Sequence, residues 1–207
     1  MKLSRKLWES NIEIAKQSLN TNFVQGIKSG ELPKNKFQSY IAQDYYFLMC
    51  FARSYGLAIS KSNDINSIKI LSGLLMGVSE ELILHESYAK KWECNLSLNK
   101  IKPATKQYTD FLDEVSKKFN MIEIMVAMSP CMSLYSWIGK NLAKSNIDNT
   151  YKEWVITYSD ESFSNLAKAL EDLIDIQSEA YNFKLLNKIY EKAMELELNF
   201  FEEYSDF

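Results

Sequence analysis

Glycine and proline are scarce in this chain, at 6 and 3 of its 207 residues. Tight turns between short strands depend heavily on these two residue types. Their scarcity therefore argues against a sandwich or barrel built from many short strands. The three cysteines, Cys50, Cys94 and Cys131, are an odd number without the spacing of a disulfide framework. That usage is typical of proteins kept in a reducing compartment.

A concentration of charge of one sign is also lacking. The 24 basic and 27 acidic residues are mixed along the sequence and give a net charge of −3. Nucleic-acid binding needs clustered Lys and Arg, so we expect no nucleic-acid partner. No apolar segment follows the basic N-terminal residues, and no uncharged run approaches the length of a membrane-spanning helix. We expect a soluble, cytoplasmic protein with no membrane partner.

Apolar residues make up 46 % of the chain and aromatic residues 13 %, enough for a packed core. Their spacing is helical: Phe37, Ile41, Phe51 and Tyr55 recur with a period near 3.6 residues. Similar patterns predict helices over residues 3–19, 22–29, 35–62, 64 or 66 to about 92, 105–119, 122–145, 150–159, 161–177 and 183–204. Residues 95–102 are polar and predict a loop. We therefore predict a single all-α domain over residues 1–207.

Cys131 follows Pro130 directly, inside an apolar run that otherwise predicts a core helix. Proline inside a helix removes one backbone hydrogen bond and costs about 3 kcal/mol. It also disfavours the helical conformation at Ser129. We expect the helix to be interrupted here so that the thiol points into a cavity. The alternative is a small buried residue beside a packing kink, because cysteine is among the most buried residue types.

Two acidic residues lie on apolar stripes. Asp44 is seven residues from both Phe37 and Phe51, and Glu197 lies on the aromatic stripe of the last helix. A buried carboxylate must be paired, hydrogen-bonded or protonated. An apolar setting raises a carboxyl pKa and suits a general acid. The alternatives are structural: Asp44 would cap or bridge helices, and Glu197 would hydrogen-bond to a neighbouring helix. Glu195 points to another face and is expected to be solvated.

His85 is the only histidine and lies four residues after Glu81, so the two share a helix face. Di-iron bundle proteins place a Glu-x-x-His motif on each of two helices. The spacing here differs and no second histidine exists, so that centre is excluded and we expect no metal. A pair that braces two helices is the preferred interpretation. A site with one histidine and several carboxylates remains the alternative.

Tyrosines could line a pocket for a flat ring, because a phenol combines an aromatic face with a polar group. The candidates are Tyr45, Tyr46, Tyr108, Tyr135 and Tyr158. Aromatic residues at helical spacing also form ordinary cores. The methionines Met121, Met125, Met128 and Met132 are interpreted as residues that fill core gaps.

Several motifs occur together in one order. They are Phe37-x2-Tyr40-x2-Gln43-Asp44-Tyr45-Tyr46, Glu81-Leu82-Ile83-Leu84-His85, Pro130-Cys131-x3-Tyr135 and Trp154-x3-Tyr158, after Phe23-Val24-Gln25-Gly26-Ile27. With these motifs the sequence resembles the TenA family, thiaminase II or aminopyrimidine aminohydrolase, along nearly the whole chain. The resemblance implies one haem-oxygenase-like helical domain, a homotetramer and no cofactor.

The resemblance also implies roles for matched residues. Cys131 matches a nucleophile that adds to an electron-poor carbon of an aminopyrimidine ring, and Glu197 matches the acid that protonates a ring nitrogen. Asp44 matches the carboxylate that binds the substrate amino group. Tyr108, Tyr135 and Tyr158 match pocket tyrosines, with Tyr158 expected to hold Glu197. The implied ligand is an aminomethylpyrimidine or thiamin, and the implied role is thiamin salvage.

The chain departs from the family pattern at two aromatic positions. Phe47 stands where many relatives have a tyrosine, so stacking would remain and a hydrogen bond would be lost. Phe201 replaces the tryptophan of the usual C-terminal motif. These changes bear on substrate preference. Two other functions stay open: a non-catalytic helical binding or regulatory protein, and an oxidase that shares the fold.

Overall fold

The chain folds into a bundle of α-helices, and this computed structural model describes residues 1–97, 100–177 and 182–207. Within these ranges there are helices and no strand, as the apolar periodicity predicted. The helices are α1 (Leu3–Ser10), α2 (Ile12–Leu19), α3 (Asn22–Ser29), α4 (Lys34–Ser60), α5 (Ile65–Trp92), α6 (Pro103–Lys118), α7 (Met121–Ala143), α8 (Lys152–Ser159), α9 (Glu161–Ile176) and α10 (Phe183–Glu202). The predicted loop at 95–102 includes residues 98–99, which lie outside the described part.

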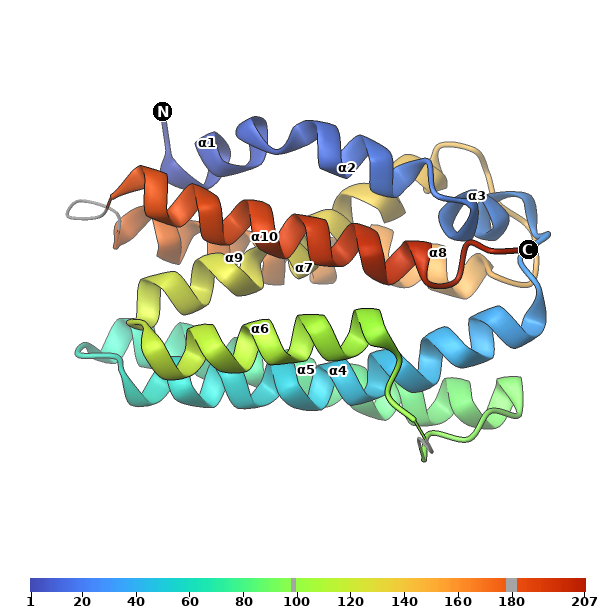
Figure 1. Cartoon of the computed structure of the whole chain (residues 1–207), viewed down its shortest axis with the longest axis horizontal. Helices are drawn as coiled ribbons and strands as arrows, with labels where there is room; N and C mark the ends of the chain where they lie inside the picture. Colours follow the sequence, from blue (N-terminus) through green and yellow to red (C-terminus); the bar gives the residue numbers. More distant parts are fainter. Residues whose placement is uncertain (98–99, 178–181) are drawn as a thin grey trace.

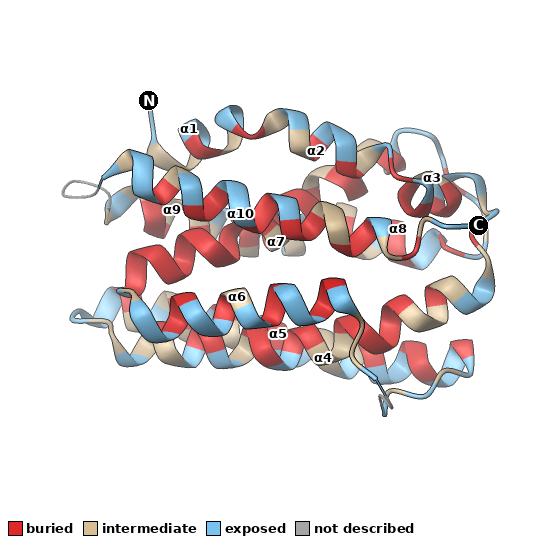
Figure 2. Ribbon diagram, viewed as in Figure 1, coloured by how far each residue is buried: buried red, intermediate tan, exposed pale blue. Residues whose placement is uncertain are grey.

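Figure 1 shows α4, α5 and α6 side by side on one side of the bundle, with α1, α2 and α10 on the other. Helix α7 runs between these groups and packs against α4, α6, α8, α9 and α10. It is buried along nearly its whole length, as its colour in Figure 2 shows. The four methionines of the predicted set lie on or at the start of α7 and are all buried, so their interpretation as core residues is confirmed.

Local sequence signals set several helix ends. Asp64 caps α5 by accepting a hydrogen bond from the Ser67 backbone N–H at 2.8 Å. Asn120 and Glu123 form a reciprocal capping box at the start of α7. Pro103 is the first residue of α6, where a missing N–H has no cost. These caps fix the starts of α5, α6 and α7, which carry Glu81, Tyr108 and Cys131 of the site described below.

The prediction of one helix over residues 3–19 was wrong. The segment forms two helices, α1 and α2, which are separated at Asn11. Asn11 is buried, and its side-chain amide donates to the Leu7 carbonyl at 2.8 Å and to Asn187 Oδ1 at 3.1 Å. An asparagine that bonds to nearby backbone competes with helical hydrogen bonds. The side-chain contact to α10 thus accounts for the break.

The expected interruption at Pro130 was also wrong. Helix α7 continues through Ser129, Pro130 and Cys131 without a break. The local cost of a proline is about 3 kcal/mol. Burial of the surrounding α7 residues against five helices outweighs that cost, because each fully buried Leu, Ile or Met side chain contributes roughly 1.5–3 kcal/mol.

Helix α7, which carries Glu123 and Lys140 and so is not an uncharged run, is nevertheless long and apolar enough, by length and composition, to cross a membrane. Of its most apolar window, 83 % is buried inside the fold. Core helices of soluble proteins pass the same test, so the length of α7 is accounted for by its central position in the bundle.

Helices α7 and α8 approach each other at Gly139. A Cβ atom built there would lie 2.5 Å from the Tyr158 carbonyl carbon and 2.7 Å from the Ser159 nitrogen. Only a residue without a side chain fits against this backbone. The close approach places Tyr158 beside α7.

We expect Gly139→Ala to lower the free energy of unfolding by about 1–3 kcal/mol or more, because the added methyl group must push α8 away from α7. Thermal unfolding would measure the change. Gly73→Ala is the matched control, since Gly73 is helical, exposed and has no neighbouring atom within 4 Å of the added Cβ. That control should be stabilised by roughly 0.5–1 kcal/mol through its better helix propensity. Equal effects of the two substitutions would contradict the packing explanation.

Candidate active site

Asp44 of α4 and His85 of α5 form a buried pair, with His85 Nε2 2.8 Å from Asp44 Oδ2. The other ring nitrogen, Nδ1, lies 2.9 Å from the Glu81 backbone carbonyl. A carbonyl oxygen only accepts, so Nδ1 must donate, and an ionised Asp44 requires Nε2 to donate as well. Both hydrogen bonds are therefore satisfied by the imidazolium form. His85 braces α4 and α5 through Asp44, and Glu81 contributes only its backbone to this contact.

The charge state of His85 follows from this geometry. Burial lowers the pKa of the imidazole, but the hydrogen bond and charge of Asp44 outweigh it and raise the pKa to about 9. The pair at neutral pH is then an imidazolium next to a carboxylate. A negatively charged Asp44, held in place by His85, is a strong acceptor for an amino group.

Glu197 of α10 is 1 % exposed and accepts a hydrogen bond from the Tyr108 hydroxyl of α6 at 2.8 Å. Burial raises the pKa of its carboxyl to about 8, although the Tyr108 hydrogen bond opposes the shift. Tyr108, and not Tyr158, holds this carboxyl, so the expected role of Tyr158 was wrong. The reason is spatial: α6 packs along α10 in this region, whereas Tyr158 of α8 points to α5. Glu195 is exposed and lies near Lys192, as expected.

Cys131 lies beside Glu197, close enough for the thiol and the carboxyl to affect each other's pKa. Burial, followed by the nearby charges of Glu197, Glu81 and Asp44, raises the pKa of the Cys131 thiol well above its ordinary value. A thiol of this kind ionises poorly by itself. With a carboxylate in contact, it can instead transfer its proton directly to Glu197 as it reacts.

Glu81 is a third acidic side chain at the site, and its position there was not predicted. The Tyr158 hydroxyl donates to Glu81 Oε1 at 2.9 Å. Burial raises the pKa of the Glu81 carboxyl to about 7, against the lowering effect of His85. The sequence did single out Glu81, which begins the motif that ends in His85. Helical spacing placed the two residues on one face, but it could not show that His85 bonds to the Glu81 backbone while the Glu81 side chain bonds to Tyr158.

Two small cavities meet at Asp44 and Tyr135. The first is lined by Asp44, Leu48, Phe51, Glu81, Cys131, Met132, Tyr135, Tyr158 and Phe163. The second is lined by Asp44, Phe47, Tyr108, Tyr135, Glu197 and Phe200. Cys131 opens on the first cavity and contacts Glu197 of the second. The arrangement places one thiol and three carboxyl groups around a space walled by aromatic rings.

The aromatic walls are packed against one another. The Phe47 and Tyr108 ring centroids are 4.7 Å apart, and those of Tyr135 and Tyr158 are 4.8 Å apart. The Phe201 ring packs against Tyr135 with 5.3 Å between the ring centroids, and Phe201 itself lines neither cavity. All seven residues expected at the site lie around it: Cys131, Glu197, Asp44, Tyr108, Tyr135, Tyr158 and Phe47.

Tyr45 and Tyr46 were wrongly included among the pocket tyrosines. The Tyr45 hydroxyl lies 3.3 Å from Glu86 at the surface, and Tyr46 lines a separate surface pocket with Cys50 and Arg53. Successive residues on a helix point about 100° apart, so only one face of α4 reaches the cavities. Within the described ranges, no group of three or more His, Cys, Asp or Glu side chains is placed to hold a metal ion.

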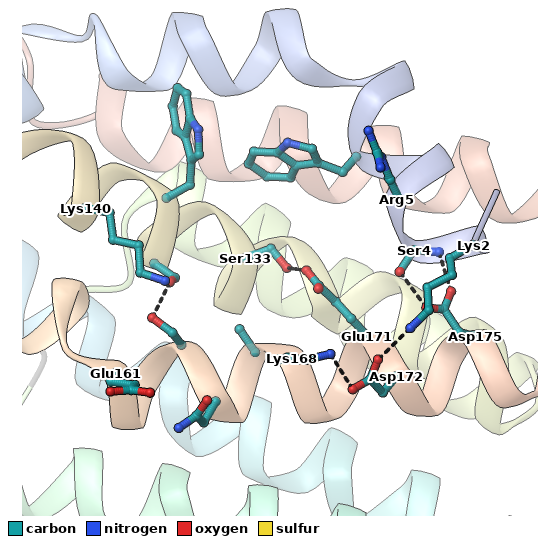
Figure 3. A pocket seen from close by; sticks show the side chains of 16 residues that line it. Lys2, Ser4, Arg5, Ser133, Lys140, Glu161, Lys168, Glu171, Asp172 and Asp175 are labelled. Atoms are coloured by element: carbon teal, nitrogen blue, oxygen red, sulfur yellow. Dashed lines mark hydrogen bonds and ion pairs between the residues drawn. The ribbon is translucent and has the colours of Figure 1, made fainter.

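A larger pocket lies elsewhere, between α1, α7 and α9 (Figure 3). Its charged side chains contact one another: Lys2 and Lys168 both pair with Asp172, and Ser133 donates to Glu171 at 2.7 Å. Ser133 follows Cys131 by two residues and therefore points to another face of α7. The two adjoining cavities, which between them hold the thiol and the three carboxyl groups, are the stronger candidate for chemistry.

Comparison with known proteins places this geometry in a family. The chain matches the TENA/THI-4/PQQC family over residues 8–206. It is 31 % identical to the mitochondrial bifunctional TH2 protein of Arabidopsis thaliana, over 96 % of this chain and 36 % of that protein. It is also 31 % identical to the aminopyrimidine aminohydrolase of Halalkalibacterium halodurans, over 89 % of this chain and 85 % of that protein. The chain thus spans about a third of the first relative and most of the second.

Solved structures share the fold. A TenA family transcription regulator from Silicibacter sp. TM1040 superposes with a TM-score of 0.93 at 24 % identity, covering 100 % of this chain and 97 % of that one. Heme oxygenase-1 of the cyanobacterium Synechocystis sp. PCC6803 superposes with a TM-score of 0.62 at 15 % identity, covering 98 % and 92 %. The expected all-α, haem-oxygenase-like fold is confirmed.

Proposed function

Since the chain belongs to the TENA/THI-4/PQQC family, we propose that it is an aminopyrimidine aminohydrolase of thiamin salvage. The proposed substrate is 4-amino-5-aminomethyl-2-methylpyrimidine, which is hydrolysed to hydroxymethylpyrimidine and ammonia. The family's other reaction, in which thiamin loses its thiazole, would use the same site. Support comes from relatives named for this activity, such as the enzymes of Halalkalibacterium halodurans and Bacillus subtilis.

The observation that carries the proposal is the contact between Cys131 and Glu197 beside the Asp44–His85 pair. Asp44, paired with His85, would accept hydrogen bonds from the 4-amino group and fix the ring. Phe47 and Tyr135 would stack against or border the ring faces. The reacting carbon would then lie within reach of the thiol, as covalent catalysis requires.

Proton transfer within the Cys131–Glu197 pair removes the difficulty of a weakly acidic thiol. As sulfur bonds to the electron-poor ring carbon, Glu197 takes the thiol proton and delivers it to a ring nitrogen. No separate thiolate and no charged ring need to form in a low-dielectric cavity. Tyr108 positions the carboxyl by its hydrogen bond. The dearomatised ring then expels the group on its exocyclic methylene, water adds to that carbon, and the thiol departs.

The test is an assay of the purified protein for ammonia and hydroxymethylpyrimidine, with Cys131→Ala in parallel. Turnover of the aminomethylpyrimidine that requires Cys131 would support the proposal. Absence of turnover with both this substrate and thiamin would reject it. A regulatory role, the function named for the Silicibacter protein, would then be the leading alternative.

We also infer a cytoplasmic homotetramer, as the family resemblance implies. Light scattering coupled to gel filtration should give a mass about four times the 24.1 kDa of one chain. A mass of one or two chains at micromolar concentration would contradict this assembly.

A further inference from the structure

Glu81 is a carboxyl group at the site that the mechanism above leaves unused. It lines the same cavity as Cys131 and Asp44, whereas Glu197 lines the adjoining one. Helix α5 carries it, so it approaches the cavity from a different side than α10, which carries Glu197. Glu81 is partly buried, and a carboxyl group withdrawn from water is costly unless it is bonded or has a partner in the reaction.

The surroundings of Glu81 keep its proton exchangeable. Tyr158 donates one hydrogen bond to Oε1 at 2.9 Å. No further hydrogen bond to the Glu81 carboxyl is recorded among the described residues, so the carboxyl can still accept from a ligand in the cavity. The charged and titratable groups around it are Asp44, Tyr40 and Tyr55 from α4, His85 and Tyr88 from its own helix, Cys131 from α7 and Tyr158 from α8. Among these groups His85 and Asp44 form an ion pair, so their charges largely offset each other.

We propose that Glu81 is a second catalytic residue, which binds the aminomethyl nitrogen of the substrate and governs the proton with which that nitrogen leaves as ammonia. The inference rests on the proposed function and names the group that distinguishes an amine substrate. Glu197 serves the ring nitrogen, and Glu81 serves the leaving group.

The layout of the substrate fits two separate carboxyl groups. In 4-amino-5-aminomethyl-2-methylpyrimidine the aminomethyl group is on the carbon next to the one that bears the 4-amino group. The ring nitrogen N1 is across the ring from that amino group. With the 4-amino group on Asp44, the aminomethyl nitrogen and N1 are directed to different sides. The two cavities that share Asp44 and Tyr135 hold Glu81 on one side and Glu197 on the other.

The proton and electron balance closes with these two groups. The amine, as ammonium hydrogen-bonded to the Glu81 carboxylate, leaves as NH3 with the electron pair of the C–N bond, and the ring is left as a cationic methylene adduct. Water adds its oxygen to the methylene carbon and loses a proton to Glu81. The C–S bond then breaks toward sulfur, and the proton on the ring nitrogen returns to the Cys131–Glu197 pair. Glu81, now protonated, meets the next amine and transfers its proton to it.

Thiamin provides an internal comparison, because its leaving group is a thiazolium that departs as a neutral thiazole and needs no proton. Glu81→Gln keeps the shape and the oxygen that accepts from Tyr158, but it loses the charge and the proton. We expect the ratio of aminomethylpyrimidine to thiamin turnover (kcat/KM) to fall about 100-fold, within the usual range for loss of an acid–base group. Glu80→Gln, an exposed neighbour, is the matched control and should leave the ratio unchanged.

A ratio that falls by about tenfold or more supports the proposal, and a smaller change overturns it. The ratio is insensitive to partial unfolding, since both activities scale with the amount of folded protein. If neither reaction occurs in the wild type, the proposed function has failed, which is a different outcome from an unchanged ratio in Glu81→Gln.

A binding measurement tests the same contact without turnover. In the Cys131→Ala background, calorimetry would compare the affinities for the aminomethylpyrimidine and the hydroxymethylpyrimidine, with and without Glu81→Gln. Loss of a charge-assisted hydrogen bond should weaken binding of the amine about tenfold or more. The alcohol should change by less than about threefold, because it carries no ammonium to pair. If Glu81→Gln weakens binding of both ligands equally, the assignment of Glu81 to the amine is overturned. This binding measurement decides the role of Glu81 if the wild type does not cleave thiamin.

Discussion

Cys131→Ala should lower kcat for release of ammonia from the aminomethylpyrimidine by at least about 10³-fold, because alanine removes the atom that forms the covalent bond to the ring. At about 1.4 kcal/mol for each factor of ten, this is a loss of roughly 4 kcal/mol of transition-state stabilisation. Substrate affinity should change little, since the proposed binding groups Asp44 and Phe47 remain. Steady-state kinetics and calorimetry on the same protein sample would measure the two effects.

The control for this variant is Cys94→Ala. Cys94 is a free, partly buried cysteine just beyond the end of α5, and it does not line either cavity. That substitution removes the same sulfur atom from the chain and should leave kcat within about twofold, as expected for a position outside the site. Near-normal turnover in Cys131→Ala would sink the nucleophilic mechanism, whatever the result for Cys94.

Glu197→Gln should slow turnover by about 10²–10⁴-fold and change its pH dependence, since the amide can neither take the thiol proton nor deliver it to the ring. In the wild type the Cys131–Glu197 pair reacts when it holds one proton. At low pH it holds two, and the carboxyl has a pKa of about 8. The rate (kcat/KM) should therefore rise with pH through about 8, as an apparent pKa of the coupled pair.

In Glu197→Gln the thiol must ionise alone. Its pKa is raised well above the ordinary value by burial, so the rising limb should move to higher pH. Glu195→Gln is the matched control, because Glu195 is on the same helix and exposed. It should keep both the rate and the pH profile. A limb that stays near pH 8 in Glu197→Gln would assign that titration to another group.

The helical fold was accessible from the sequence because burial follows a period of 3.6 residues. Most helices of the structure match the predicted ranges to within a few residues. Failures occurred at Asn11 and Pro130, where local preference competed with tertiary contacts. At Asn11 a side-chain contact to α10 accompanies the break. At Pro130 the burial of α7 prevailed over the cost of a proline. Local helix propensity could not predict either outcome, because each depends on contacts with residues far away in the sequence.

The sequence predicted which residues form the candidate site better than it predicted which of them bond to each other. Asp44 and Glu197 stood out as acids on apolar stripes and Cys131 as a thiol next to Pro130, and the fold brings all three to adjoining cavities. Which tyrosine bonds to which acid was assigned wrongly, since Tyr108 and Tyr158 are on helices whose relative positions no spacing reveals. The partner of Asp44 was also missed, although His85 is the only histidine in the chain.

The sequence by itself determined that this protein is helical, that its cysteines form no disulfide framework, and which unusual residues interrupt its apolar stripes. Residue type and periodicity are local properties, and local chemistry is enough to decide them. Only the tertiary structure decided that His85 pairs with Asp44, that Tyr108 holds Glu197, and that Glu81 shares a cavity with Cys131. Each of these contacts joins residues at least 41 positions apart or from different helices. Their proton affinities depend on burial and neighbouring charge, which exist only once the helices have packed.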